Sequence, residues 1–217
     1  MKTLYYLLLE YLLILRLQLR ALWQHPPARW NTGKAGNVVL IPGFGEPWTF
    51  LATIAGQLNS RGYRVHVVPK LNYNTQPIVE CVDALHSYIT QNALPQVTLL
   101  AHSRGGIAAK LYADAHPEHV QKIISLSTPY QGTFVGYLYI CNLKELIPNS
   151  PVIQKALNNT AYTDKILNLY AQADNHVVPN AYALLPGATN QKVPVVGHTR
   201  ILEAPDALTA LIKFLHT

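Results

Sequence analysis

The 217-residue chain has few cysteines and few charged residues, and it contains neither repeats nor low-complexity tracts. Two cysteines, Cys81 and Cys141, are too few for a disulfide framework, and they could pair or stay reduced. No Cys/His group has the spacing of a zinc motif. Charged residues make up 13% of the chain and hydrophobic residues 49%. This composition indicates a rather apolar globular protein, and the length suits one domain with a full core.

The chain also lacks a long basic block with interleaved aromatic residues, although its formal net charge is +6. We therefore expect no nucleic-acid partner. Mild attraction to an anionic membrane surface fits the charge equally well, as does a simple basic protein.

The N-terminal segment lacks an uninterrupted membrane span. Residues 4–15 are apolar except for Glu10, and polar residues interrupt the apolar run again before Trp23. A span needs about 20 mostly apolar residues. A signal peptide needs a cleavage site between small residues, and none precedes Pro26.

We predict that residues 1–36 form an uncleaved hydrophobic helix and a linker, and that this helix associates with a membrane, as a docked or signal-anchor-like segment. A cleaved signal of a secreted or periplasmic protein is one alternative. A helix packed on the domain is the other.

Short apolar runs alternate with helical patterns through the rest of the chain. We expect strands at residues 38–41, 64–68, 96–101, 120–126, 165–170 and 192–196, and helices at 48–61, 76–92, 104–115 and 205–215. Near-continuous apolar strands that alternate with helices are typical of a parallel sheet covered on both faces. We therefore predict an α/β domain over residues 37–217 with a mostly parallel central sheet.

Residues 130–163 are too long for a simple connection between two of these strands, and they are rich in apolar residues. A long insertion beside a reactive edge of a sheet is usually functional, as a lid or a binding wall. We predict a short lid-like insertion. An additional core helix is the alternative, and both can be present.

A nucleophile motif lies where the third predicted strand meets a helix. Small residues, Ala101 and Gly105, flank Ser103 at two positions on either side. A G-x-S-x-G-like match between a strand and a helix places the serine hydroxyl on a tight turn near a helix N-terminus. Reactive groups of parallel sheets lie at such strand ends. The alternative is a serine in an ordinary loop.

A serine hydroxyl needs a base to take its proton, and the base needs an acid to orient it. In this type of fold, the acid follows the serine along the chain and the histidine follows the acid. Asp174 comes directly after a predicted strand and is the candidate acid. His198 is the candidate base, because it alone follows Asp174 at a late strand end, and Gly197 lets the chain turn toward Ser103. The other histidines are expected in the linker, on the loop of the acid, at the C-terminus, or as structural, surface and pocket-wall residues: His25, His66, His86, His102, His116, His119, His176 and His216.

The attacked carbonyl oxygen needs two hydrogen-bond donors, each worth about 3–4 kcal/mol of transition-state stabilisation. The residue after the nucleophile, Arg104, supplies one backbone N–H. Phe44, in the loop after the first strand, is placed to supply the other. The commoner use of the Arg104 charge is a surface ion pair.

These motifs resemble those of α/β-hydrolase lipases and esterases. The nearest resemblance is to small bacterial triacylglycerol lipases, a group with members similar to GPI inositol-deacylase hydrolases. The resemblance covers residues 37–216, and Pro42 stands where the usual histidine precedes the oxyanion glycine, without removing a catalytic group. The segments that carry it are residues 42–45, 101–106, 126–133 and 146–152, with Asp174 and residues 197–198.

The resemblance implies a serine hydrolase that cleaves carboxylic esters of acyl lipids through an acyl-enzyme on Ser103, Asp174 and His198, with no metal or organic cofactor. Its expected partners are an acyl ester or lipid and, through the N-terminal helix, a membrane surface. A thioesterase, an acyltransferase or a lipid-anchor deacylase is an alternative of the same fold. An inactive membrane-tethered binding module is an alternative from another class.

Overall fold

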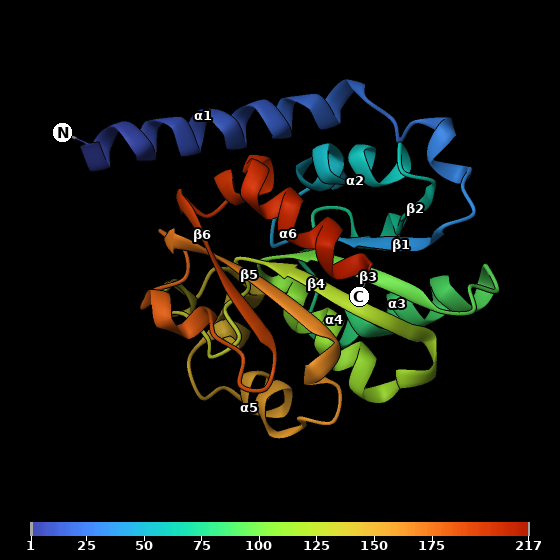
Figure 1. Cartoon of the computed structure of the whole chain (residues 1–217). Helices are drawn as coiled ribbons and strands as arrows, with labels where there is room; N and C mark the ends of the chain where they lie inside the picture. Colours follow the sequence, from blue (N-terminus) through green and yellow to red (C-terminus); the bar gives the residue numbers. More distant parts are fainter. Residues whose placement is uncertain (1, 217) are drawn as a thin grey trace.

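Six strands form one sheet in the order β2-β1-β3-β4-β5-β6, and every neighbouring pair is parallel (Figure 1). The computed structural model describes residues 2–216, with side chains from residue 4 onward. The strands are β1 (Gly36–Ile41), β2 (Tyr63–Val67), β3 (Val97–His102), β4 (Val120–Leu126), β5 (Ile166–Ala173) and β6 (Thr189–Val196). The predicted α/β fold with a parallel central sheet is confirmed.

Helices cover both faces of the sheet because alternate strand residues pack in opposite directions. Val39 and Leu99 belong to the core under α3, α4 and α5, whereas Val38 and Leu100 belong to the core under α1, α2 and α6. Figure 1 shows α1, α2 and α6 on one side of the sheet and the other three on the opposite side. The helices are α1 (Lys2–Trp23), α2 (Ala52–Asn59), α3 (Ile78–Gln91), α4 (Arg104–Ala115), α5 (Pro151–Asn158) and α6 (Pro205–Leu215).

Between β4 and β5, two 3₁₀ helices, η5 (Phe134–Leu138) and η6 (Cys141–Leu146), precede α5, and a third, η7 (Thr163–Lys165), follows it. Helix α5 is a core element, since Ile153 and Ala156 are fully buried against the same core as α4. The 3₁₀ segment instead exposes large apolar side chains: Phe134, Tyr137, Leu138, Tyr139 and Ile140. A lid role for this segment stays a prediction.

The two cysteines do not pair. Cys81 is buried in α3, with its sulfur 2.9 Å from Asn74 Oδ1, and Cys141 is exposed in η6. Burial raises the pKa of the Cys81 thiol to about 11, so this thiol stays protonated at neutral pH.

The structure corrects the predicted localisation at the N-terminal helix. Within residues 2–216, no helix combines the length and the apolarity needed to cross a bilayer. The predicted membrane association of an uncleaved hydrophobic helix is therefore wrong. Glu10, Arg16 and Arg20 interrupt the apolar run. Whether residues 1–36 form a unit apart from 37–217 stays a prediction.

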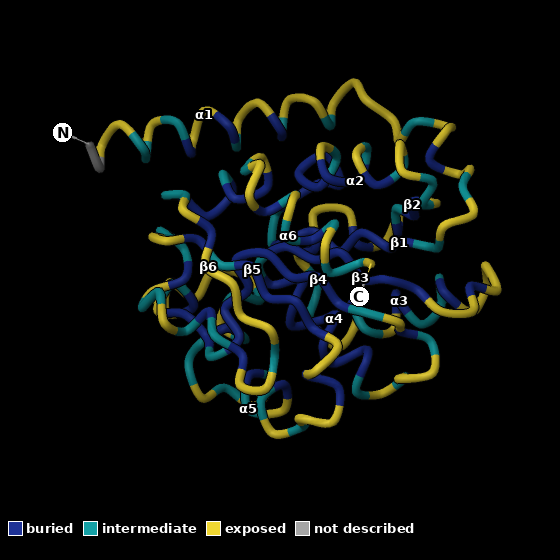
Figure 2. Tube along the Cα trace, in the orientation of Figure 1, coloured by how far each residue is buried: buried dark blue, intermediate teal, exposed yellow. Residues whose placement is uncertain are grey.

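Helix α1 packs along the domain. Leu13 and Leu17 are buried in the core that also contains α2 and α6, and Glu10, which shares their face of α1, is fully buried. Thr49 Oγ1 donates a hydrogen bond of 2.8 Å to the Leu17 carbonyl oxygen. Figure 2 shows short buried stretches that recur along α1 between exposed ones.

We expect Leu17→Ala to lower the free energy of unfolding by about 2–5 kcal/mol, because it removes a fully packed side chain and leaves a cavity. Leu15→Ala is the matched control, since Leu15 is 54% exposed on the same helix and should change stability by less than about 0.5 kcal/mol. Urea unfolding of the full chain measures both values. Equal midpoints for the two variants would contradict the packing of α1.

Candidate active site

Ser103 occupies a turn that reverses the chain between β3 and α4. Its φ is 53° and its ψ is −130°, a region that residues with a side chain rarely adopt. The backbone is held there from both sides. Ser103 N–H donates to the Leu126 carbonyl oxygen at 2.8 Å, and Thr128 Oγ1 donates to the Ser103 carbonyl oxygen at 2.9 Å.

Gly105 lets helix α4 approach the end of β1. A Cβ at this position would overlap the Ile41 carbonyl oxygen and would lie 2.7 Å from the Pro42 carbonyl oxygen. Position 105 must therefore be small for two reasons: the turn is tight, as expected, and the neighbouring strand β1 lies in contact with it. Any larger residue would displace the serine turn or β1.

His198 and Asp174 are in direct contact at the ends of β6 and β5. His198 Nδ1 lies 2.9 Å from both carboxylate oxygens of Asp174, and both side chains are almost fully buried. Asp174 Oδ1 also accepts the backbone N–H groups of His176 at 2.8 Å and Val177 at 2.9 Å. These bonds fix the carboxylate on its loop.

Electrostatics within this pair favour the ionised acid and the protonated base. Burial alone would raise the pKa of Asp174, but the neighbouring His198 and the two backbone N–H groups hold it well below its usual range. Burial alone would lower the pKa of His198, but Asp174, followed by Glu46 and Glu10, raises it above its ordinary value. The imidazole is thereby prepared to accept a proton.

His176 lies beside the candidate base, with ring centroids 4.6 Å apart. Burial, and then the nearby His198, lower the pKa of His176 to about 4. Its ring is therefore neutral at pH 7, and His198 is the imidazole that can gain charge in this cavity.

Phe44 and Arg104 offer backbone donors near Ser103. Phe44 lies on the loop after β1, and Arg104 is the first residue of α4, where a helix leaves its N–H groups without internal acceptors. Within residues 2–216, neither N–H has a hydrogen-bond acceptor. Both N–H groups can therefore donate a hydrogen bond to a bound group.

The loop after β1 is braced by a buried carboxylate. Glu46 Oε2 accepts the Gly43 N–H at 2.7 Å and lies 2.8 Å from His102 Nδ1. The other ring nitrogen of His102 lies 3.2 Å from the His198 carbonyl oxygen. His102, expected only as packing or pocket wall, therefore links the loop of Phe44 to the loop of His198.

Two side chains of helix α1 form hydrogen bonds to the loop of His198 and to the loop of Phe44. Glu10 accepts the backbone N–H groups of Thr199 at 2.5 Å and Arg200 at 3.1 Å, directly after His198. Gln18 Nε2 donates to the Gly45 carbonyl oxygen at 2.7 Å. The N-terminal helix is thus part of the framework that positions the candidate base and the loop of Phe44.

Close approach of Glu10 also explains the glycine before the base. Gly197 has a φ of 122°, and a Cβ there would overlap the Glu10 carboxylate. A larger residue at this position would push α1 away from the loop of His198.

The Arg104 side chain is buried and does not form the surface ion pair that is common for arginine. Its guanidinium lies 2.8 Å from Glu145 Oε2 and donates to the Asn74 carbonyl oxygen at 2.9 Å. Glu145 also accepts the Ile78 N–H at 3.0 Å, at the start of α3. One buried ion pair thus joins the serine turn, α3 and the insertion.

A cavity of about 260 Å³ opens between these elements. Ser103, Phe44 and His198 line it together, so the structure brings the predicted nucleophile, base and one predicted donor to one space. No hydrogen bond joins the Ser103 hydroxyl to His198 within residues 2–216. The remaining wall is mostly apolar: Ile14, Phe50, Pro129, Val135, Leu143, Leu146 and Val177, with Gln18, Glu46, Thr133, His176 and Thr199.

One group in this site has ligand atoms within 4.8 Å of one another, as a metal site would: Glu46, His102 and His198. Glu46 is already engaged by Gly43 and His102, and His198 Nδ1 is engaged by Asp174. We therefore assign these residues to one another and not to a metal.

Sequence reasoning missed four supporting residues: Glu10, Gln18, Glu46 and Glu145. Glu10 gave a signal, because an acidic residue in an apolar helix must find donors if the helix packs on a protein. The other three have no local pattern that points to their partners.

We expect Arg104→Met to lower the free energy of unfolding by about 3–5 kcal/mol, because it leaves Glu145 and the Asn74 carbonyl oxygen without their buried partner. Arg64→Met is the matched control, since Arg64 is exposed on β2. Urea unfolding monitored by circular dichroism provides the comparison. Two variants of equal stability would show that the buried pair does not stabilise the fold.

Solved structures with the same architecture are numerous, and all of those compared here have low sequence identity. A monoacylglycerol lipase of Paleococcus ferrophilus aligns with a TM-score of 0.65 at 16% identity, covering 85% of this chain and 95% of that one. The mature lipase BlEst2 of Bacillus licheniformis gives 0.63 at 16% identity, with 88% and 94% covered. A structure from work on carboxylesterases of Nitrososphaera gargenis gives 0.61 at 15%, with 85% and 93% covered. These likenesses establish the α/β-hydrolase fold.

No curated protein matches the sequence. One family model, described as the PGAP1-like alpha/beta domain, matches residues 63–193, which is more than half of the chain. The matched range runs from β2 to β6 and includes the serine turn and Asp174. With the fold and the arrangement at Ser103, this match shows that the chain belongs to the PGAP1-like alpha/beta domain family.

Proposed function

We propose that this protein is a serine hydrolase that cleaves carboxylic esters of acyl lipids through an acyl-enzyme. One observation carries the proposal: Ser103, held at a positive φ, lines the same cavity as His198, whose ring is bonded to Asp174. Strained backbone of this kind costs about 1–3 kcal/mol and is concentrated at functional sites.

The proposed reaction begins when Ser103 Oγ attacks the acyl carbonyl carbon and His198 takes the hydroxyl proton. Because Nδ1 of His198 faces Asp174, Nε2 is the nitrogen left for this transfer. The backbone N–H groups of Phe44 and Arg104 stabilise the oxyanion. His198 then protonates the leaving alcohol as the ester C–O bond breaks. Water, deprotonated by His198, releases the carboxylic acid and restores Ser103.

The apolar wall of the cavity favours an acyl chain as the bound group. Its volume of about 260 Å³ is slightly below the range of about 300–1,000 Å³ typical of pockets for drug-sized ligands. We expect short and medium acyl chains to be cleaved faster than long ones. The monoacylglycerol lipase and carboxylesterases among the structural neighbours add indirect support.

We expect a fluorophosphonate probe to label the wild-type chain at Ser103, and Ser103→Ala to lose both labelling and ester hydrolysis by at least about 10⁴-fold. Asp174→Asn should lower kcat by about 10⁴-fold, because the ring loses the acceptor that sets its tautomer. Ser60→Ala is the control, since Ser60 is remote at the end of α2.

The substrates for this test are p-nitrophenyl esters of increasing chain length, acyl-thioesters and a triglyceride emulsion. Hydrolysis confined to thioesters would replace the ester hydrolase with a thioesterase. Absence of labelling, under conditions that label a known serine hydrolase, would favour an inactive binding module.

We expect kcat/KM for a neutral ester to rise with pH through a single midpoint above the ordinary pKa of histidine, because only neutral His198 acts as a base and Asp174 raises its pKa. Glu10→Gln removes one of the charges that raise this pKa, so the midpoint should move to lower pH. Glu80→Gln, at an exposed position on α3, should leave it unchanged. A pH–rate profile of the three proteins decides, and an unmoved midpoint in Glu10→Gln would contradict the role of Glu10.

A further inference from the structure

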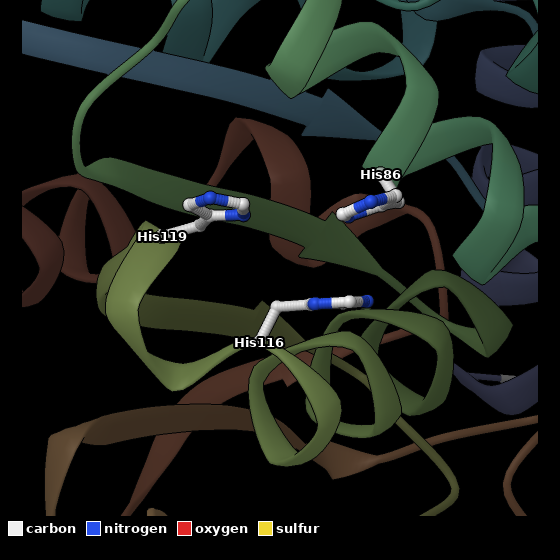
Figure 3. A group of neighbouring side chains, drawn as sticks. All are labelled: His86, His116 and His119. Carbon is white, nitrogen blue, oxygen red and sulfur yellow. The ribbon is translucent and has the colours of Figure 1, made fainter.

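Three histidines gather at the end of α4 that is remote from Ser103. His86 lies on α3, His116 follows α4, and His119 lies in the turn before β4 (Figure 3). Each offers a ring nitrogen, and these nitrogens all lie within 4.8 Å of one another. Because Ser103 and His116 bracket the 12 residues of α4, the cluster lies about 18 Å or more from the nucleophile.

The nitrogens of this cluster have few competing partners. Within residues 2–216, the rings of His86 and His116 make no hydrogen bond, and Nδ1 of His86 is buried without a partner. Such a buried, unpaired nitrogen is costly unless another ligand satisfies it. The nearest carboxylate is Glu118, whose Oε1 lies 3.8 Å from His116 Nδ1 and 3.8 Å from His119 Nε2.

Tyr112 orients the third ring. Its hydroxyl lies 2.9 Å from His119 Nδ1. When Nδ1 of His119 carries the ring proton and donates it to the Tyr112 oxygen, Nε2 keeps its lone pair for a metal. Nε2 lies 3.8 Å from Glu118 Oε1. Such an outer hydrogen bond is the usual partner of a metal-binding histidine.

We propose that His86, His116 and His119 form a site for a divalent transition metal, with Zn²⁺ as the expected ion. Neutral imidazole is a preferred ligand of zinc, and three histidines with one open position are an established zinc geometry. Glu118 or a water molecule completes the tetrahedral set.

Metal binding requires a modest rotation of the rings. The rings of His86 and His116 are stacked, with centroids 4.1 Å apart and planes at 18°, and His119 lies 5.8 Å from His86. Ligating nitrogens on one zinc ion lie about 3.3 Å apart, given Zn–N bonds of about 2.0 Å. The outer torsion of histidine is broad, so the rings can turn at low cost and direct their lone pairs to one point.

The bound ion would join α3 to the connection between α4 and β4. This position gives it a stabilising role, separate from the chemistry at Ser103. The site draws its ligands from residues 33 positions apart in sequence at most, which explains why no zinc spacing motif marks it.

The test is isothermal titration calorimetry of the metal-stripped full chain with Zn²⁺. We expect one equivalent to bind with a dissociation constant in the low micromolar range or below, and Mg²⁺, which prefers oxygen ligands, not to bind. At a zinc concentration 100 times the dissociation constant, the Tm should rise by about 5–10 °C.

His86→Gln and His119→Gln should each weaken zinc binding at least tenfold and abolish the Tm shift. His86→Gln is the primary variant because glutamine suits an interior helix position that is half-buried. His25→Gln, at an exposed position before the first strand, is the matched control and should bind as the wild type does. Circular dichroism without metal checks that each variant is folded.

Two results would overturn the proposal. One is wild-type protein that binds Zn²⁺ no more tightly than Mg²⁺. The other is zinc binding that persists in His86→Gln and His119→Gln but disappears in Glu46→Gln, which would place the ion in the cavity of Ser103.

Discussion

The reversal of the chain at Ser103 constrains most of its surroundings. A buried strand ends and a buried helix begins within one residue, so α4 must pass directly over the end of β1, and only glycine at position 105 allows that approach. The same reversal directs the Arg104 side chain into the protein, where its charge needs a partner. Glu145 provides it from the insertion. The geometry of the serine turn is thereby linked to the insertion, which lines part of its cavity.

Three carboxylates act on the imidazole of His198. Asp174 is hydrogen-bonded to the ring, and Glu46 contacts His102. Glu10, on α1, accepts the backbone N–H of Thr199, next to His198. Each is buried or nearly so, where water screens charge poorly. Their common effect is a raised pKa for His198, and their hydrogen bonds to backbone N–H groups hold the loops in place. The same groups therefore contribute to both shape and charge at the candidate site.

Much of the fold could be predicted because its signals are local. Apolar strand runs of four to seven residues, separated by helical patterns, indicated a parallel sheet, and all six strands are found close to the expected residues. The motif around Ser103 was likewise local, since a tight turn restricts the residues two positions away. The N-terminal helix was misassigned because the sequence pattern does not show that its apolar residues pack on the domain. Glu10 belongs to a buried contact with residues 199 and 200, far away in sequence.

Local patterns specify the alternation of strands and helices and the small residues around Ser103, because each depends on residues close together in the chain. The chain order of serine, acid and histidine is likewise read directly from the sequence. Which buried charges meet depends on the three-dimensional packing. Arg104 with Glu145, Glu46 with His102, and Glu10 with the loop of His198 join residues from separate elements. The clustering of His86 with His116 and His119 is of the same kind. Such contacts depend on how helices pack across the sheet, and no local pattern encodes that packing.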